Sequence, residues 1–124
     1  MKKLFKIVFL VSMGLFLNSC YYDTLVEEPV QEIPNDPDDP NYVEISFGSE
    51  IQPIFTNNCV QCHSAVDPNL TAGNAYGNLV PEYVTAGNSD ASKLYTQVLS
   101  GHGGASNNDI ALIKGWIDQG AKNN

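Results

Sequence analysis

The sequence has few basic residues. It contains six lysines or arginines against fourteen aspartates and glutamates, and its formal net charge is −8. Half of the basic residues, Lys2, Lys3 and Lys6, stand at the very start of the chain. Proteins that bind nucleic acid need a basic surface to neutralise phosphates. We therefore expect no nucleic-acid partner.

Groups that bind metals or carry out catalysis are also scarce. The chain has three cysteines and two histidines, and outside a cluster at positions 59–63 only Cys20 and His102 remain. A structural zinc site needs four ligands, which residues so far apart are poorly suited to supply. No nucleophile with a neighbouring base and no phosphate-binding loop is recognisable. The sequence therefore predicts that the chain is not an enzyme.

A long apolar run is missing as well. Residues 7–17 form a short apolar stretch behind the first lysines, and a membrane span takes about 20 residues. A charged start and a short apolar middle are typical of an export signal, which we assign to residues 1–19. Its end, Leu17-Asn18-Ser19-Cys20, resembles the lipobox of bacterial lipoproteins. The resemblance implies that Cys20 is lipidated; the alternative is an ordinary signal followed by an incidental cysteine.

The composition changes after the signal. Every charged residue between positions 21 and 46 is acidic, and prolines alternate with aspartates from Pro34 to Pro40. Charge repulsion and proline stiffness keep such a segment extended and without a core. We therefore predict an acidic tether at 20–46 that links lipidated Cys20 to a globular domain at 47–124. The expected location is the cell membrane or outer membrane, facing the periplasm or exterior.

The most specific motif is Cys59-Val60-Gln61-Cys62-His63. This Cys-x-x-Cys-His spacing indicates covalent attachment of a c-type haem. On a helical turn both thiols reach one porphyrin edge, so we interpret Cys59 and Cys62 as thioether anchors and His63 as the proximal iron ligand. The alternative is a disulfide or a redox-active Cys-x-x-Cys pair. A thioredoxin-like pair would be expected in a βαβ context, whereas the pattern before Cys59 is helical.

Apolar residues recur at helical spacing through the domain, which predicts an all-α fold. Helices are expected at about 49–63, with Pro53 in the first turn, around 75–80, from 88 or 89 to 100, and from 107 or 108 to about 119. The residues expected to face inward from the last two helices are Leu94, Tyr95, Val98, Leu99, Ile110, Ile113, Trp116 and Ile117. Gly115 is expected to permit a close helix crossing. For so small a domain, one haem would complete a marginal core.

Three segments in this order resemble the small class I-type cytochromes c, and more closely a bacterial subgroup found as lipoproteins or as domains of larger proteins. The segments are 51–55 ahead of the haem motif, 87–95 and 110–121. The resemblance covers residues 47–124. It implies an all-α fold wrapped around one haem, crossing terminal helices and a role in electron transfer.

The second iron ligand departs from that family, which usually employs a methionine between the last two helices. Here methionine occurs only at Met1 and Met13. His102 stands among glycines in the corresponding loop, and we predict it as the distal ligand. The alternative is an exposed histidine beside a five-coordinate or water-ligated iron. On the proximal side, a backbone carbonyl near Pro68 is expected to accept the other ring N–H of His63, unless this is an ordinary turn proline.

These features together predict a membrane-tethered, monohaem c-type cytochrome that transfers single electrons between redox protein partners outside the cytoplasm. We expect it to act as a monomer. Two alternatives remain open. With an open iron position the haem would suit gas sensing or peroxide chemistry, and a haem that only stabilises the fold would leave a partner-binding module.

Overall fold

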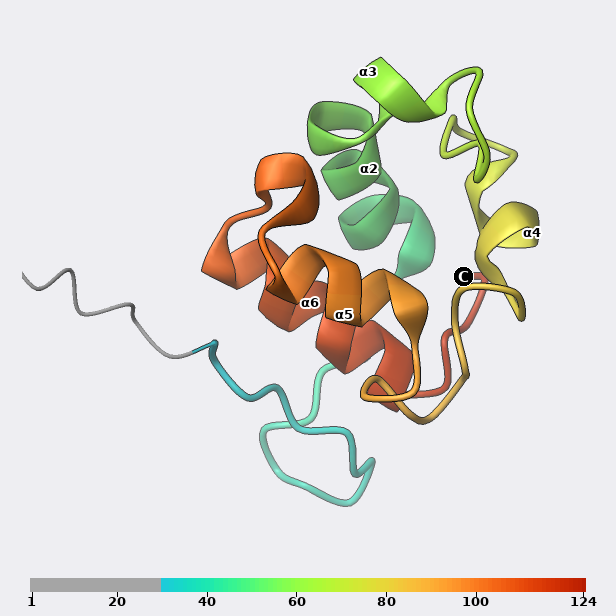
Figure 1. The fold of residues 1–124 in the computed structure, drawn as a ribbon. Coiled ribbons are helices and arrows are strands. Elements are labelled where there is room, and N and C mark those ends of the chain that lie inside the picture. The colour runs from blue at the N-terminus through green and yellow to red at the C-terminus, as the bar shows by residue number, and fades with distance from the viewer. Residues whose placement is uncertain (1–29) are drawn as a thin grey trace, which may run out of the picture.

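The computed structural model describes residues 30–124, which form a body of short helices without a strand (Figure 1). This confirms the predicted all-α class for the described part of the chain. The predicted signal peptide, and Cys20 with it, lie outside the described residues. In chain order the elements are the π-helical turn η2 (Phe47–Ile51), α2 (Gln52–Asn58), α3 (Val60–His63), α4 (Ala75–Leu79), α5 (Lys93–Leu99), the 3₁₀ turn η3 (His102–Gly104) and α6 (Asn107–Asp118).

The first predicted helix is present as three consecutive pieces, η2, α2 and α3. It begins at Phe47 because the hydroxyl of Ser46 accepts a hydrogen bond from the backbone N–H of Ser49 at 3.3 Å. Pro53 lies in the first turn of α2, as predicted, where its missing N–H costs no helical bond. Cys59 separates α2 from α3.

Of the two middle helices, one lies where it was predicted and the other begins later than predicted. The prediction of a short helix around 75–80 is confirmed by α4. The next helix, α5, begins at Lys93 and not at 88 or 89. The Asn88 side chain accepts from Ala91 N at 3.1 Å but closes only a turn, and Ser89 donates its N–H and hydroxyl to the Asp118 carboxylate at 2.9 and 3.1 Å. Leu99 was expected to face inward and is 50% exposed, since it lies at the open end of α5.

Helix α6 carries a capping box one residue ahead of the predicted start. The Ser106 hydroxyl accepts from Asp109 N at 3.2 Å, and the Asp109 carboxylate accepts from Ser106 N at 3.1 Å. Reciprocal capping of this kind satisfies two helix-terminal N–H groups. The predicted inward face is confirmed, because all four of its residues are buried: Ile110, Ile113, Trp116 and Ile117.

The core is centred on aromatic rings. The ring of Phe47 lies 5.3 Å from those of Tyr76 and Trp116 and 6.2 Å from that of Phe55, measured between centroids. Trp116 donates its indole N–H to Lys122 O at 2.9 Å, so its polar edge is satisfied. This cluster joins the first helical segment to α4 and α6, which brings the two ends of the domain together.

The acidic segment departs from the tether prediction over its described part. Residues 30–46, which we call the strap, contact the end of α6 at both ends, while the loop between these ends projects from the domain (Figure 1). Ile45 is 3% exposed, and Val30 and Ile33 pack against the core. Apolar side chains spaced between the acids explain the difference, because their burial offsets the repulsion that would extend the chain.

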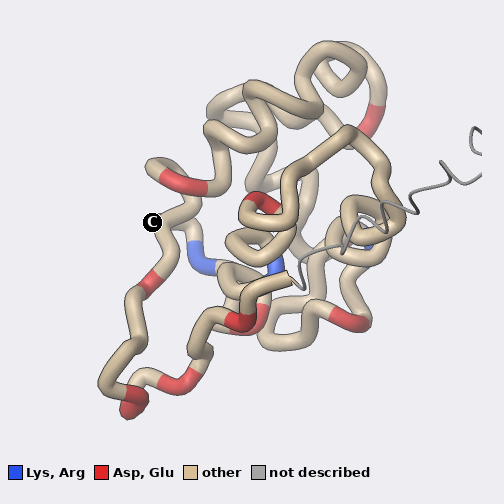
Figure 2. Tube along the Cα trace, turned by 90° about the vertical axis from the view of Figure 1, so that its left-hand side faces the viewer, with Lys and Arg blue, Asp and Glu red and all other residues tan. Residues whose placement is uncertain are grey.

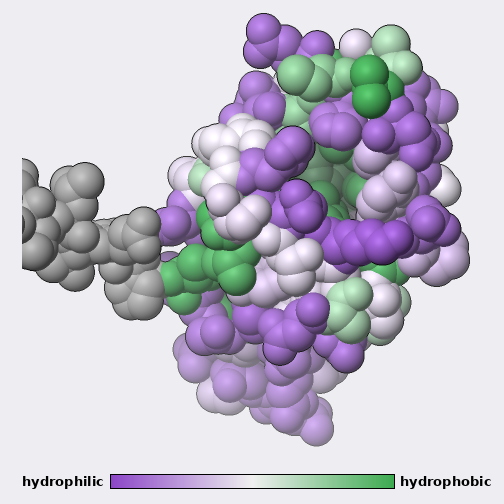
Figure 3. Space-filling model, viewed as in Figure 1, coloured by the Kyte–Doolittle hydropathy of each residue, from purple (hydrophilic) through white to green (hydrophobic). Residues whose placement is uncertain are grey.

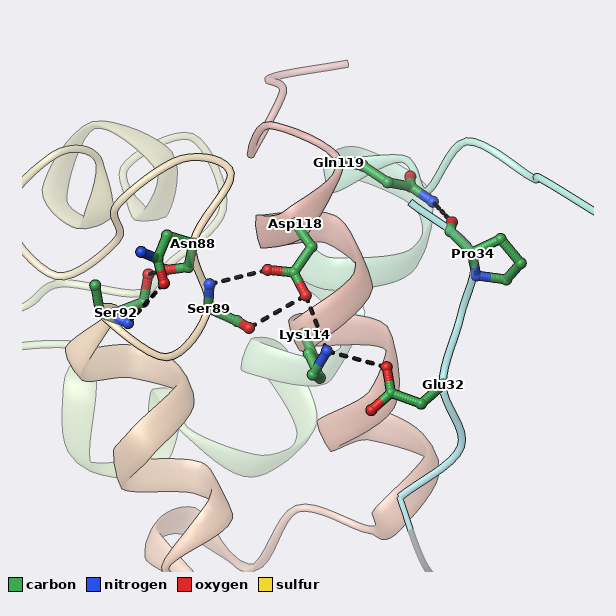
Figure 4. A network of polar contacts seen from close by, with 9 residues as sticks. Glu32, Pro34, Asn88, Ser89, Ser92, Lys114, Asp118 and Gln119 are labelled. Atoms are coloured by element: carbon green, nitrogen blue, oxygen red, sulfur yellow. Dashed lines mark hydrogen bonds and ion pairs between the residues drawn. The ribbon is translucent and has the colours of Figure 1, made fainter. Parts of the chain in front are cut away.

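Polar contacts fix the strap to α6. The Gln119 side chain donates to Pro34 O and Val43 O at 2.9 and 3.0 Å and accepts from Ile45 N at 2.9 Å (Figure 4). Lys114 bridges Glu32 of the strap and Asp118 of its own helix at 3.1 and 3.0 Å.

The remaining acids of the strap are left in solvent. Acidic residues are seen on a loop that projects from the helical body (Figure 2). Asp36 and Asp38 are exposed, and Asp39 is partly buried. Lys122 pairs with Glu44 at the far end of the strap.

Gly115 is what lets the strap approach so closely. A Cβ at this position would lie 2.7 Å from Ile45 Cδ1 and 3.2 Å from Ile33 Cβ. The prediction of a close helix crossing at Gly115 is therefore wrong, because the strap and not a second helix occupies this space.

Replacing Gly115 with alanine should displace the strap. The intrinsic helix propensity would improve by about 1 kcal/mol, but the added methyl group would push Ile33 and Ile45 away. Hydrogen–deuterium exchange of residues 30–46 should become several-fold faster. The matched control is Gly77→Ala in α4, where a Cβ meets nothing within 4 Å; it should leave strap exchange unchanged. Equal exchange in both variants would show that Gly115 does not seat the strap.

Candidate functional site

The motif residues form one helical turn. The Cys59 carbonyl accepts from Cys62 N at 3.1 Å and from His63 N at 2.9 Å, so α3 begins directly behind Cys59. Residues three or four apart lie on one helix face, and Cys59, Cys62 and His63 accordingly line one cavity. Cys59 is half-buried and Cys62 is exposed, and both are free thiols.

His63 is held by the loop that follows it. Its Nδ1 lies 3.1 Å from the carbonyl oxygen of Pro68, and its own carbonyl accepts from Leu70 N at 2.8 Å. The hydrogen bond predicted for Pro68 is therefore present. It assigns the ring proton to Nδ1 and leaves Nε2 as the nitrogen free to bind a ligand.

His102 lies opposite His63, on the turn between α5 and α6. The backbone there has positive φ at Gly101, Gly103 and Gly104, with values of 91°, 79° and 65°. Gly103 comes so close to the motif that a Cβ would be 3.8 Å from Cys59 Sγ. The His63 and His102 ring centroids are 6.1 Å apart, with an interplanar angle of 70°. The structure thus brings both histidines to one place.

The cavity between these residues has a volume of about 460 Å³. Figure 3 shows a hollow with a hydrophobic floor and a hydrophilic rim, in the region that Figure 1 shows bounded by α3, α4 and α5. Its apolar wall includes side chains from the loop after α3, from α4 and from α5: Leu70, Leu79, Leu94 and Val98. The volume falls within the range of roughly 300–1,000 Å³ that small-molecule and cofactor sites occupy.

Three polar side chains of this wall were missed by the sequence analysis. Lys93 and Gln97 are one helical turn apart on α5, and Tyr83 lies between α4 and α5. The Lys93 ammonium lies 5.5 Å from the centre of the Tyr83 ring and 3.7 Å from the Glu82 carboxylate. The spacing of Lys93 and Gln97 beside Leu94 and Val98 was the available signal; Tyr83 gave none, because it lies in an irregular segment.

The electrostatic environment of Cys59 favours the protonated thiol. Burial raises the pKa of this thiol, and the nearby Asp109 carboxylate raises it further. Cysteines that act as redox nucleophiles have lowered pKa values, because the thiolate is the reactive form. The burial of Cys59 and its nearness to Asp109 therefore disfavour a role as a redox nucleophile.

No protein-family model, no curated protein and no solved structure matches the chain. The site geometry and the sequence therefore carry the functional argument. Among the described residues, moreover, no group of three or more histidine, cysteine, aspartate or glutamate side chains is arranged to hold a metal ion by itself.

Proposed function

We propose that this chain is a membrane-tethered, monohaem c-type cytochrome that transfers single electrons between redox protein partners outside the cytoplasm. The observation that carries the proposal is the convergence of two thiols and two imidazoles, from α3 and from the turn before α6, on one apolar cavity. Haem iron, when bound, supplies one-electron redox chemistry.

The separation of the histidines fits this cofactor. The ring centroids of His63 and His102 lie 6.1 Å apart, and both side chains line the cavity. A histidine nitrogen lies about 2.0 Å from a metal that it binds, so both imidazoles are close enough that they could hold one haem iron. Two histidines alone are too few for a protein-only metal site, but they suffice where a porphyrin supplies the other four nitrogens.

The cavity supports the same conclusion. The cavity has a volume of about 460 Å³, is open at its rim and is lined largely by apolar side chains. A flat, largely apolar ligand would bury this surface from water, and that burial would stabilise the complex.

The residues of the chain have separate tasks in this proposal. Cys59 and Cys62 form the thioether bonds, while His63 and His102 bind the iron. The Pro68 carbonyl holds the His63 ring through Nδ1 and increases its basicity. The apolar wall excludes water, which lowers the local dielectric around the charge that changes on electron transfer.

One observation favours a second candidate function. His102 is exposed, and the glycines beside it allow its turn to change conformation. Were His102 to leave the iron, one coordination position would open for a gas molecule or peroxide. The redox-active thiol pair receives no such support, given the raised pKa of Cys59.

The membrane attachment is the part of the proposal that depends on sequence alone. We propose lipidation at Cys20, followed by an acidic segment that ends in the strap. No helix among residues 30–124 is long and apolar enough to cross a membrane. Because Val30, Ile33 and Pro34 contact the domain, the 20–46 segment does not stand away from it over its whole length.

Covalent haem attachment is tested directly by denaturation. The full chain, produced in cells that mature c-type cytochromes, should keep haem-stained peroxidase activity after denaturing electrophoresis. Cys59→Ala/Cys62→Ala should lose the stain. A wild-type chain whose haem dissociates on denaturation would rule out thioether bonds.

His102 ligation should be visible in the spectrum of the oxidised protein. We expect a low-spin iron without a methionine-to-iron charge-transfer band. His102→Ala should give a high-spin spectrum and let the reduced iron bind carbon monoxide. High-spin wild-type protein, or an unchanged variant, would favour the sensing or peroxide function instead.

Lipidation can be tested by fractionation. Cys20→Ser should move the protein from the membrane pellet to the soluble fraction, because its membrane affinity would reside in the acyl chains. Retention of the variant in membranes after a high-salt wash would locate the anchor elsewhere.

A further inference from the structure

We infer that Tyr83 is a positioning residue for His63: through Asp67 it holds the Pro68 carbonyl that orients the His63 ring. The inference rests on the proposed function, because it assigns Tyr83 a role in setting the properties of the bound iron. Tyr83 does not itself contact His63 in this arrangement; it acts through the loop between them.

Two hydrogen bonds and the peptide link between Asp67 and Pro68 connect Tyr83 to His63. The Tyr83 hydroxyl donates to Asp67 Oδ2 at 2.8 Å. Asp67 immediately precedes Pro68, whose carbonyl oxygen lies 3.1 Å from His63 Nδ1. The Tyr83 hydrogen bond therefore holds the residue directly before Pro68, whose carbonyl fixes the His63 imidazole.

Tyr83 is itself firmly supported. Its backbone N–H donates to Leu79 O of α4 at 2.8 Å, and its carbonyl accepts from Leu94 N of α5 at 3.0 Å. The side chain lines the same cavity as His63 and Pro68. A hydroxyl held by two helices can restrain a loop, whereas one on a mobile segment cannot.

The loop at 64–69 needs such a restraint. Its other hydrogen bonds are local: Asn69 Nδ2 donates to Ser64 O at 3.2 Å, and Leu70 N donates to His63 O at 2.8 Å. These bonds close the loop but do not tie its middle to α4 or α5. The hydrogen bond to Asp67 makes that connection.

The donor stays protonated at neutral pH. The hydrogen bond to Asp67 raises the pKa of the Tyr83 phenol, with smaller contributions in the same direction from desolvation and from the Asp67 and Glu82 charges. The phenol therefore donates to the Asp67 carboxylate throughout the physiological range.

Loss of the hydroxyl should change the iron rather than the fold. A loosened Pro68 carbonyl would accept a weaker hydrogen bond, the imidazole would become less basic, and the oxidised iron would be less stabilised. Groups in direct contact with a metal ligand change metal affinity or activity by about 10- to 100-fold. Tyr83 acts at one further remove, so we expect about a threefold shift in the redox equilibrium, or roughly 30 mV for one electron.

The test compares Tyr83→Phe with Tyr76→Phe in the full-length, haem-loaded protein. Both variants lose one phenol hydrogen bond, because the Tyr76 hydroxyl donates to Ala121 O at 3.0 Å, but Tyr76 does not contact the loop at 64–69 through it. The phenylalanine ring at 83 keeps its place beneath Lys93. The measurements are the reduction potential and, in the reduced protein, the solvent exchange of the His63 Nδ1 proton by NMR.

We expect Tyr83→Phe to raise the potential and to accelerate Nδ1 proton exchange several-fold, with neither change in Tyr76→Phe. Identical behaviour of the two variants would overturn the inference and leave the cytochrome proposal intact. If the wild-type chain carries no covalent haem, the proposed function fails, and the same exchange measurement on the chain as isolated decides the inference. Faster exchange only in Tyr83→Phe would uphold it, and equal exchange would reject it.

Discussion

The packing of Phe47 against three other aromatic rings determines how the rest of the domain is arranged. Its centroid distances of 5.3 Å to Tyr76 and Trp116 place the start of the domain against α4 and α6. Aromatic pairs at such distances contribute about 0.5–1.5 kcal/mol beyond the area that they bury. One half of the molecule is therefore filled by its own side chains. The other half, between α3 and α5, contains the cavity, which the chain surrounds but does not fill.

The strap shows how composition can mislead about packing. Its acids and prolines satisfy every criterion for an extended segment, yet Ile33 and Ile45 lie against Gly115. The Gln119 side chain makes hydrogen bonds with three backbone groups of the strap, which would otherwise need water as their partner. The contacts of Ile33, Ile45 and Gln119 therefore determine where the strap lies, despite its acidic and proline-rich composition. The acids that make no such contact project into solvent on the loop around Asp38.

Local signals in the sequence predicted most of the helices. Apolar spacing identified the buried face of α6 and the short helix α4, because both depend on side chains within one helical turn. The start of α5 was wrong, since Ser89 bonds to Asp118 across the fold and cannot cap a helix of its own. A hydrogen bond between residues so far apart in the sequence cannot be recognised from the residues next to either partner. The same holds for Tyr83, whose partner Asp67 comes from a different loop.

For the site, the motif at 59–63 and the pairing of His63 with Pro68 could be read from residues close in sequence. His102 was selected from the lack of a methionine outside residues 1–19 and from its glycine-rich loop, whereas its 6.1 Å distance from His63 depends on how α5 and α6 position the turn between them. The resulting arrangement is asymmetric. His63 is restrained by a helical turn and by the Pro68 carbonyl, whereas His102 stands between glycines whose positive φ angles only glycine adopts readily.

This asymmetry bears on the proposed electron transfer. If His63 bound haem iron, the helical turn and the Pro68 carbonyl would keep its position when the iron changed oxidation state, so little reorganisation would be needed on that side. If His102 bound as well, the glycines beside it would let its turn adjust without strain in α5 or α6. Histidine on both sides also favours a lower reduction potential than a histidine–methionine pair, which raises it. In the proposed cytochrome, His63 would be the ligand with the fixed position, and His102 would complete the iron coordination that sets the reduction potential.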